Sequence, residues 1–304
     1  MKVASTSISG TPPVVQARMA DYLELIKPRI SVMVLITVAT GVLLASRGLP
    51  DWAVLCHTLI GTALVAAGAS ALNQLLERES DALMQRTENR PLPAGRLQAL
   101  EVLVFGAGLG VGGVAYLLIT LSHWLAAFIA ACTFLSYVFV YTPLKRKTSL
   151  NTLVGAIPGA LPPVIGWAAV RGSVDREIMA LFGIIFLWQV PHFLAIAWIY
   201  REDYRRAGLC MLPVLDQEGN MSGRQMVAYC LALIPVSLAP LMVGAAGWYY
   251  LIGALSLGVG FLAFAVAFAR QHSLFRARGV LRASLLYLPA LLALLLLDGV
   301  TRTH

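Results

Sequence analysis

The sequence predicts an all-α membrane protein with about nine transmembrane helices in one bundle, and three features support this. Of 304 residues, 59% are hydrophobic and 12% are charged, whereas soluble domains average about 45–50% apolar and about 25% charged residues. Several uncharged runs approach the roughly 20 residues that cross about 30 Å of hydrocarbon. These runs are continuous rather than alternating, which argues against a β-barrel. We place the nine spans at residues 29–47, 53–74, 97–120, 122–141, 151–170, 178–200, 225–246, 247–269 and 281–299.

The N-terminal part of the chain is expected to divide at residue 20. Residues 1–20 are rich in Ser, Thr and Pro, which predicts a disordered tail, and residues 21–304 are expected to form a single transmembrane domain. Residues 21–29 (DYLELIKPR) have the pattern of a short interfacial helix. Lys27 and Arg29 are expected to be anchors at the membrane interface, and a contact with phosphate is the alternative. The four cysteines show no CxxC spacing, so we expect neither a disulfide framework nor a zinc site.

The basic residues are distributed so unevenly that they predict the orientation of the chain. Of the 23 lysines and arginines, only Arg47, Arg171, Arg176 and Arg302 fall on the outer side when the N-terminus is placed inside. The positive-inside rule therefore predicts a cytoplasmic N-terminus. It also explains most of the net charge of +8, so no nucleic acid is expected as a partner. The first twenty residues have no apolar signal-peptide core and few arginines, which favours a bacterial inner (plasma) membrane.

The most polar stretch of the chain, NQLLERESDALMQRTENRPLPAG at residues 73–95, lies between two apolar spans. If the preceding helix continues into it, Asn73, Glu77 and Asp81 are spaced i, i+4, i+8 and share one face. An amide and two carboxylates in this order form an oxygen-rich strip that suits Mg²⁺. Arg86 and Arg90 follow in the same loop, and such cations beside a metal suit a diphosphate. The alternative is a charged loop that is simply solvated.

A second polar stretch, SYVFVYTPLKRKT at residues 136–148, ends the fourth span. Tyr141 and Lys145 are spaced i, i+4, which aligns them if Pro143 does not disturb the helix. The adjacent cations Lys145 and Arg146 would face the acidic strip and bind phosphate. Read alone, however, the three neighbouring cations Lys145, Arg146 and Lys147 are more typical of the positive-inside rule.

The fifth and sixth spans contain residues that membrane helices rarely carry. Glycines and prolines interrupt span 151–170, which predicts that it lines a cavity or packs at the centre of the bundle. Gln189 and His192 lie well inside span 178–200, where polar groups usually face the interior, either in a functional role or in hydrogen-bonded packing. Asp203, next to Tyr204, ends that span among arginines, much as Asp81 ends the second span.

These three stretches give the chain a family resemblance. The chain resembles the haem O synthase (protohaem IX farnesyltransferase) family of the intramembrane prenyltransferase superfamily. The resemblance rests on residues 73–95, YTPLKRKTSLNTLVGAIPGALPPVIGW and QVPHFLAIAWIYREDYRRAGLCMLPV. The resemblance covers roughly residues 20–300. It implies a helix bundle around a central cavity that is open to lipid and capped on the inner side. It also implies transfer of a farnesyl group from farnesyl diphosphate to a vinyl carbon of haem b, with addition of water, and two aspartate-rich motifs that hold the diphosphate through Mg²⁺.

The resemblance assigns roles to particular residues. Asn73, Glu77 and Asp81 match the first motif and Asp203 matches part of the second, so these four are the expected metal ligands. With Lys145 they form the expected catalytic set. The remaining expected substrate contacts are Arg86, Arg90, Tyr141, Arg146, Gln189, His192 and Tyr204.

The chain also departs from the superfamily pattern. Gln74 stands where an aspartate is usual, and no carboxylate lies four residues from Asp203, since Ile199 and Ala207 occupy those positions. Fewer acids put a site with two metals in doubt.

The expected chemistry suits these residue types. A departing diphosphate needs metal and cationic side chains, and an allylic carbocation needs a dry apolar pocket. The vinyl group is a π nucleophile, so no protein nucleophile is required. His192, with Gln189, would hold haem through the iron or the propionates.

The expected partners are farnesyl diphosphate, haem b and the lipid bilayer, with haem A synthase or terminal oxidase subunits as further candidates. One alternative function is prenylation of a quinone or chlorin ring. Another is a transporter or lipid-binding protein whose polar residues line a pathway.

Overall fold

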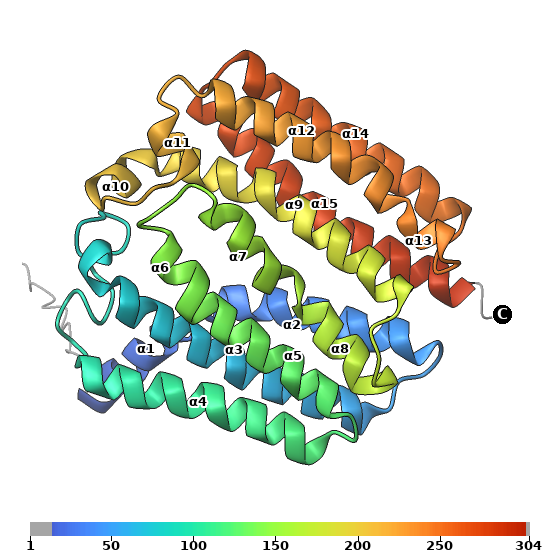
Figure 1. Cartoon of the computed structure of the whole chain (residues 1–304), viewed down its shortest axis with the longest axis horizontal. Coiled ribbons are helices and arrows are strands. Elements are labelled where there is room, and N and C mark those ends of the chain that lie inside the picture. Colours follow the sequence, from blue (N-terminus) through green and yellow to red (C-terminus); the bar gives the residue numbers. More distant parts are fainter. Residues whose placement is uncertain (1–13, 302–304) are drawn as a thin grey trace, which may run out of the picture.

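The computed structural model describes residues 14–301, and this part of the chain folds into long helices that run side by side (Figure 1). Nine helical segments of this part are long and apolar enough to cross a membrane, which confirms the predicted class. The unbroken segments are α2 (Pro28–Ser46), α3 (Trp52–Asp81), α4 (Ala99–Thr120), α9 (Arg176–Ile199), α14 (Trp248–Arg270) and α15 (Leu274–Thr301). The segments with a break or a change of helix type are α5 (Trp124–Leu135) with η1 (Ser136–Tyr141) and α6 (Thr142–Leu144), α7 (Asn151–Ala160) with α8 (Pro162–Arg171), and α12 (Asn220–Ser237) with α13 (Ala239–Met242).

The helix boundaries differ from the predicted spans where charged residues continue a helix. The second span was expected to end at residue 74, but α3 continues to Asp81. The last span was expected to begin at residue 281, but α15 begins at Leu274. In both places the helix extends beyond the apolar run, because outside the hydrocarbon it still forms its own backbone hydrogen bonds.

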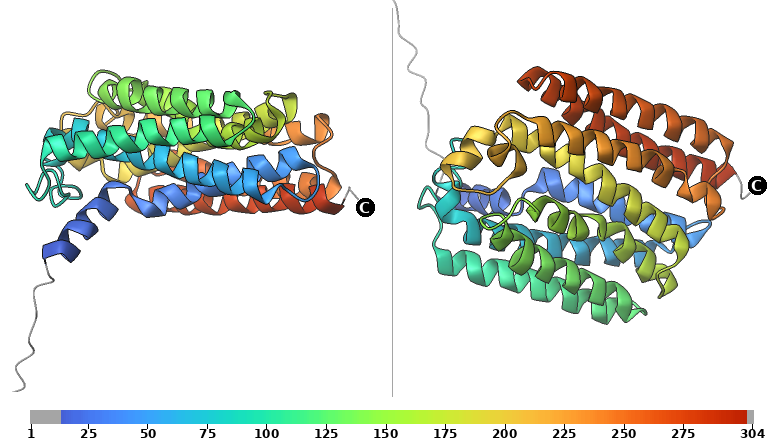
Figure 2. Two further views of the ribbon diagram at one scale, coloured as in Figure 1. Left: turned by 90° about the horizontal axis from the view of Figure 1, so that it is seen from below. Right: turned by 45° about the horizontal axis from the view of Figure 1, so that its top comes forward.

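The first helix, α1 (Val14–Leu25), projects from one side of the bundle, as the left view of Figure 2 shows. It begins earlier than the helix expected over residues 21–29, so the predicted disordered tail is wrong for residues 14–20. Residues 1–13 of that tail lie outside the described residues. Arg96 ties α1 to the loop before α4, since its Nε lies 2.7 Å from Oδ1 of Asp21 and its Nη2 lies 3.1 Å from Oε2 of Glu24.

The glycine- and proline-rich span lies at the centre of the bundle, as its sequence predicted. Helices α7 and α8 meet at Leu161, and this segment is the most completely buried of the nine. Helix α8 packs so closely on α2 that a Cβ atom added to Gly166 would lie 2.1 Å from the carbonyl oxygen of Val38. The absence of a side chain there permits the two backbones to touch.

Three connections lie together at one end of the bundle and form a cap (Figure 1). They are residues 82–98, 145–150 and 200–219, the last with α10 (Arg201–Arg206) and α11 (Leu212–Leu215). Asn151 joins two of them, because its Nδ2 donates to the carbonyl oxygens of Thr148 at 2.6 Å and Cys210 at 3.0 Å. The backbone N–H of Cys210 in turn donates to the carbonyl of Lys145 at 2.8 Å.

Candidate active site

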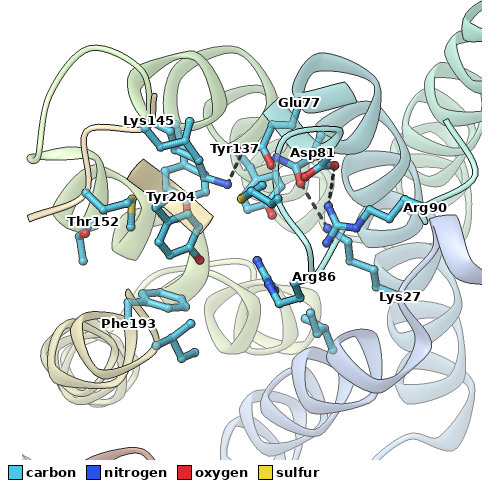
Figure 3. Close-up of a pocket in the computed structure, with 17 residues that line it drawn as sticks. Lys27, Glu77, Asp81, Arg86, Arg90, Tyr137, Lys145, Thr152, Phe193 and Tyr204 are labelled. Atoms are coloured by element: carbon cyan, nitrogen blue, oxygen red, sulfur yellow. Dashed lines mark hydrogen bonds and ion pairs between the residues drawn. The ribbon is translucent and has the colours of Figure 1, made fainter. Parts of the chain in front are cut away.

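The last turns of α3 carry the acidic strip that the sequence predicted. Because α3 is continuous from Trp52 to Asp81, Asn73, Glu77 and Asp81 lie on successive turns of one face. All three line a cavity of about 210 Å³ beneath the cap (Figure 3). Their exposed fractions are only 1%, 9% and 1%, so each polar group needs a partner inside the protein or in a ligand.

Lys145 faces Glu77 across the cavity. Its Nζ lies 2.6 Å from Oε1 of Glu77 and 4.6 Å from the centre of the Tyr141 ring. The π-helical turn η1 precedes Pro143 and accommodates it within the helix, so Tyr141 and Lys145 stay on the same side. Burial alone would lower the pKa of Lys145, but the neighbouring Glu77 carboxylate outweighs it and raises the pKa well above its usual value. The lysine is therefore a permanent cation in this cavity.

Arg90 closes the cap loop over the end of α3. Its Nη1 lies 2.7 Å from Oδ2 of Asp81, and the hydroxyl of Thr87 donates to the carbonyl oxygen of Asp81 at 2.9 Å. The other carboxylate oxygen of Asp81, Oδ1, is buried and has no hydrogen-bond partner among the described residues. A buried carboxylate oxygen without a partner is costly, so the site has one acceptor that a ligand or a cation can use.

Lys27 also lines the cavity, although the sequence predicted an interface anchor. The residue adopts a left-handed backbone (φ 46°) between α1 and α2, and its Nζ donates to Oδ1 of Asn73 at 3.2 Å. The Nδ2 of Asn73 donates to the hydroxyl of Thr142 at 3.1 Å. Burial, and then the nearby Arg90 charge, lower the pKa of Lys27 to about 7. The anchor prediction for Lys27 was wrong, because its side chain lines the cavity, and the alternative contact with phosphate stays a prediction.

The rest of the cavity wall is aromatic and apolar, with one more cation. The Arg86 guanidinium lies 4.9 Å from the centre of the Tyr200 ring. Burial raises the pKa of Tyr204, so its phenol stays protonated and can donate a hydrogen bond. Figure 3 shows Arg86, Lys145 and Arg90 around the acidic strip, with Tyr204 and Phe193 opposite. The wall residues that sequence analysis did not single out are Ile30, Met84, Tyr137, Thr152, Phe193, Ile196, Leu209 and Met211.

Four predicted site residues are not among those that line this cavity. Asp203 instead accepts the backbone N–H of Gln85 at 3.3 Å and pairs with Arg206, so it braces the cap loop. Arg146 points to the outer surface of α3, where its Nη1 lies 3.7 Å from Oε2 of Glu79.

The polar pair inside α9 has packing partners. The amide nitrogen of Gln189 donates to the carbonyl oxygens of Ala156 at 3.3 Å and Ile185 at 3.0 Å. The Nδ1 of His192 lies 2.8 Å from the hydroxyl of Ser284 on α15, and its ring stacks on Trp188. The hydrogen-bonded packing that was the alternative for these residues is therefore what this structure contains.

The oxygen atoms of the strip fit one cation better than two. Among residues that the structure describes, no group of three His, Cys, Asp or Glu side chains converges as a metal cluster would. Mg²⁺, however, is commonly held by one or two carboxylates while substrate phosphates and water supply the other ligands. Asp81 with its free Oδ1, Glu77 and the Asn73 amide oxygen meet that requirement.

A comparison with known families decides what kind of protein this cavity belongs to. The profile of the UbiA prenyltransferase family matches residues 34–297. The chain belongs to the UbiA prenyltransferase family. Among its family relatives, the protoheme IX farnesyltransferase of Solibacter usitatus is 50% identical over 289 residues, which cover 92% of this chain and 99% of that protein. The protoheme IX farnesyltransferase of Koribacter versatilis is 42% identical over 297 residues, with 94% and 95% covered.

Solved structures of UbiA proteins share this fold. A structure of digeranylgeranylglyceryl phosphate synthase has a TM-score of 0.79 at 18% identity and covers 94% of this chain and 99% of that one. A UbiA homologue from Archaeoglobus fulgidus, bound to GPP and Mg²⁺, has a TM-score of 0.61 at 16% identity, with 90% and 99% covered. These likenesses show the fold of the bundle. The nine apolar helical segments of the described residues, together with the family match, indicate a multi-pass membrane protein.

Proposed function

We propose that this UbiA prenyltransferase transfers the farnesyl group of farnesyl diphosphate to a vinyl group of haem b, with addition of water, and releases haem O and diphosphate. The names of its relatives support the choice of both substrates. The observation that carries the proposal is the meeting of Lys27, Arg86, Arg90 and Lys145 around Glu77 and Asp81 in one cavity. Three permanent cations, together with Lys27, whose pKa of about 7 lets it take up a proton beside a polyanion, are suited to a polyanion that arrives with a divalent cation.

The cations of the cavity act on the leaving group. In the proposed reaction the bond between farnesyl C1 and the diphosphate oxygen breaks, and the electron pair leaves with the diphosphate. Lys145, Arg90 and Arg86 stabilise the charge that develops on its oxygens. We propose that Asn73, Glu77 and Asp81 hold Mg²⁺, which when bound supplies further positive charge to the diphosphate. A role of Asp203 in holding metal stays a prediction, since its carboxylate braces the cap in this structure.

The apolar wall of the cavity protects the reactive carbon. Phe193, Ile196 and Met211 line the same cavity as the acidic strip, where they would exclude water from the allylic cation until the vinyl group attacks. The terminal vinyl carbon forms the new bond to farnesyl C1, and the positive charge moves to the vinyl carbon next to the porphyrin ring. Water then adds to that carbon and loses a proton, which gives the hydroxyethylfarnesyl group.

We propose that His192 contacts haem b. Its Nδ1 is occupied by Ser284, which leaves Nε2 as the nitrogen for iron or a propionate. Gln189 is a poorer candidate for this contact, because its amide nitrogen already donates hydrogen bonds to the carbonyl oxygens of Ala156 and Ile185.

We further propose that the capped end of the bundle faces the cytoplasm of a bacterium, as the distribution of basic residues suggests. Haem O would then pass to haem A synthase or to a terminal oxidase subunit in the same membrane.

Mass spectrometry of haem extracted from cells with and without this gene tests the proposed function. We expect a haem species heavier by one hydroxyethylfarnesyl modification only when the gene is present. Unmodified haem together with a newly prenylated quinone or chlorin would assign the enzyme to another acceptor. A purified protein that releases no pyrophosphate from farnesyl diphosphate, haem b and Mg²⁺ would favour a transporter or lipid-binding protein instead.

A further inference from the structure

Most arginines at the capped end of the bundle fall into two groups, apart from Arg29 at the start of α2 and Arg86 in the cavity. Eight arginines near the cavity and its cap each lie within 4 Å of a carboxylate: Arg18, Arg78, Arg90, Arg96, Arg146, Arg201, Arg205 and Arg206. Five others stand exposed at the same end of α12, α14 and α15, and none of them has a carboxylate partner within the described residues: Arg224, Arg270, Arg276, Arg278 and Arg282. The positive-inside rule explains how many arginines lie at this end, but it does not explain why the second group is unpaired.

Two arginines of the second group share one face of α15. Arg278 and Arg282 are spaced i, i+4 and are both exposed, whereas Ala277, Val280 and Ser284 on the opposite face are fully buried. The buried face packs within the bundle, where α15 contacts α14 and α9 (Figure 1). The arginine pair therefore projects away from the protein.

The same outward face of α15 is apolar on both sides of the arginines. Phe275, one turn before Arg278, is 74% exposed, and Leu286, one turn after Arg282, is 66% exposed. Because α15 belongs to a membrane span, large apolar residues exposed on its outer face contact lipid chains. Arginines at such a boundary extend their side chains to the level of the lipid headgroups.

We propose that Arg278 and Arg282 bind the phosphate of an anionic phospholipid, in the leaflet at the capped end of the bundle. Each guanidinium group presents a fork of donors that matches phosphate oxygens, and the i, i+4 spacing places the two arginines on one face. The lipid's acyl chains would lie along Leu285 and Leu286, both of which are exposed. The site is separate from the cavity, because neither arginine lines it. An anionic lipid also supplies the counter-charge that the protein itself does not provide here.

Native mass spectrometry of the detergent-purified full chain with added dioleoyl phosphatidylglycerol tests the proposal. We expect phosphatidylglycerol to remain bound to the wild-type protein and dioleoyl phosphatidylcholine to be lost. The double variant R278Q/R282Q should bind phosphatidylglycerol roughly tenfold or more weakly, since each basic residue at a headgroup contributes to the attraction. R278K/R282K, which keeps the charges but loses the fork, should retain part of the binding.

The matched control removes the same charge from the first group. R78Q/R205Q also loses two exposed arginines at this end, but each of these has a neighbouring glutamate, so this variant should bind phosphatidylglycerol as the wild type does. Equal binding of phosphatidylglycerol by R278Q/R282Q and the wild type would overturn the proposal. So would an equal loss in both double variants, which would show a general charge effect, or equal retention of phosphatidylcholine by the wild type. Circular dichroism of each variant confirms that its helices are intact.

Discussion

The Nζ of Lys145 lies 2.6 Å from Oε1 of Glu77, although 68 positions of sequence separate the two residues. This ion pair joins the end of α3 to the connection before α7, so it closes the cavity from two sides. A diphosphate that enters must share the lysine with the carboxylate. The pair is thus a structural link and, in the proposed reaction, it holds a cation close to the leaving group.

Removal of the Lys145 ammonium should slow the reaction more than it weakens folding. Lys145→Ala is expected to lower kcat/KM for farnesyl diphosphate by roughly 10²–10³, the usual loss when one stabilising donor is removed. Pyrophosphate release measures this. Lys147→Ala is the matched control, because Lys147 is exposed and does not line the cavity. Equal losses in the two variants would contradict the proposed role of Lys145.

Asp81 should be the most sensitive carboxylate of the strip. Asp81→Asn keeps the shape of the side chain but removes the charge that Arg90 and a cation would share, so pyrophosphate release should fall at least about tenfold. The Mg²⁺ concentration for half-maximal rate should also rise. Glu79→Gln, an exposed neighbour on the same helix, should change neither quantity. An unchanged Mg²⁺ requirement in Asp81→Asn would remove Asp81 from the set of metal ligands.

His192 is predicted to matter for haem rather than for farnesyl diphosphate. His192→Ala should weaken haem b binding in an absorbance titration, because iron or propionate loses its nitrogen partner. The affinity for farnesyl diphosphate should be unchanged, since His192 does not line the diphosphate cavity. Ser284→Ala, which frees Nδ1, should give a smaller loss. Haem binding that is the same in His192→Ala and the wild type would leave the histidine with a packing role only.

The start of α12 carries a pH-dependent contribution to stability. Burial alone would raise the pKa of Asp216, but hydrogen bonds from backbone N–H groups, including that of Ser222 at 2.7 Å, outweigh it and lower the pKa. The carboxylate therefore stabilises the fold above the usual aspartate pKa of about 3.9, and this contribution disappears as the pH falls below it.

Thermal unfolding in detergent tests whether the stabilisation by Asp216 is lost as the pH falls. Asp216→Asn should lower the unfolding midpoint at pH 7, and the difference from the wild type should shrink toward zero below about pH 4. Glu218→Gln serves as the control, because Glu218 is exposed and bonds only its neighbour Asn220 among the described residues. A difference that stays constant across this pH range would show that the Asp216 charge is not responsible.

Much of the fold and the acidic strip followed from the pattern of the sequence. Long uncharged runs specify membrane helices almost regardless of their neighbours, and the i, i+4, i+8 spacing of Asn73, Glu77 and Asp81 needs only a continuous helix to place them on one face. The partnership of Lys145 with this strip was predicted from charge and from family resemblance, and the two side chains do meet.

The partners of single polar side chains could not be predicted in the same way. A polar residue inside a span indicates that it faces the interior, but only the packing of α9 on α7 and α15 decides that Gln189 meets Ala156 and that His192 meets Ser284. Asp203 ends its helix as Asp81 does, yet the cap loop lies against it and takes up its carboxylate. These outcomes depend on contacts between segments that are far apart in the chain.

At Lys27 a left-handed backbone coincides with a side chain that lines the cavity. A lysine in this backbone region costs about 1–2 kcal/mol, and a glycine would avoid that cost. Glycine would also remove the ammonium that reaches Asn73. Under the proposed function, selection for a more stable protein and selection for a stronger diphosphate site would therefore favour different residues at the junction of α1 and α2, and the chain carries the lysine that lines the cavity.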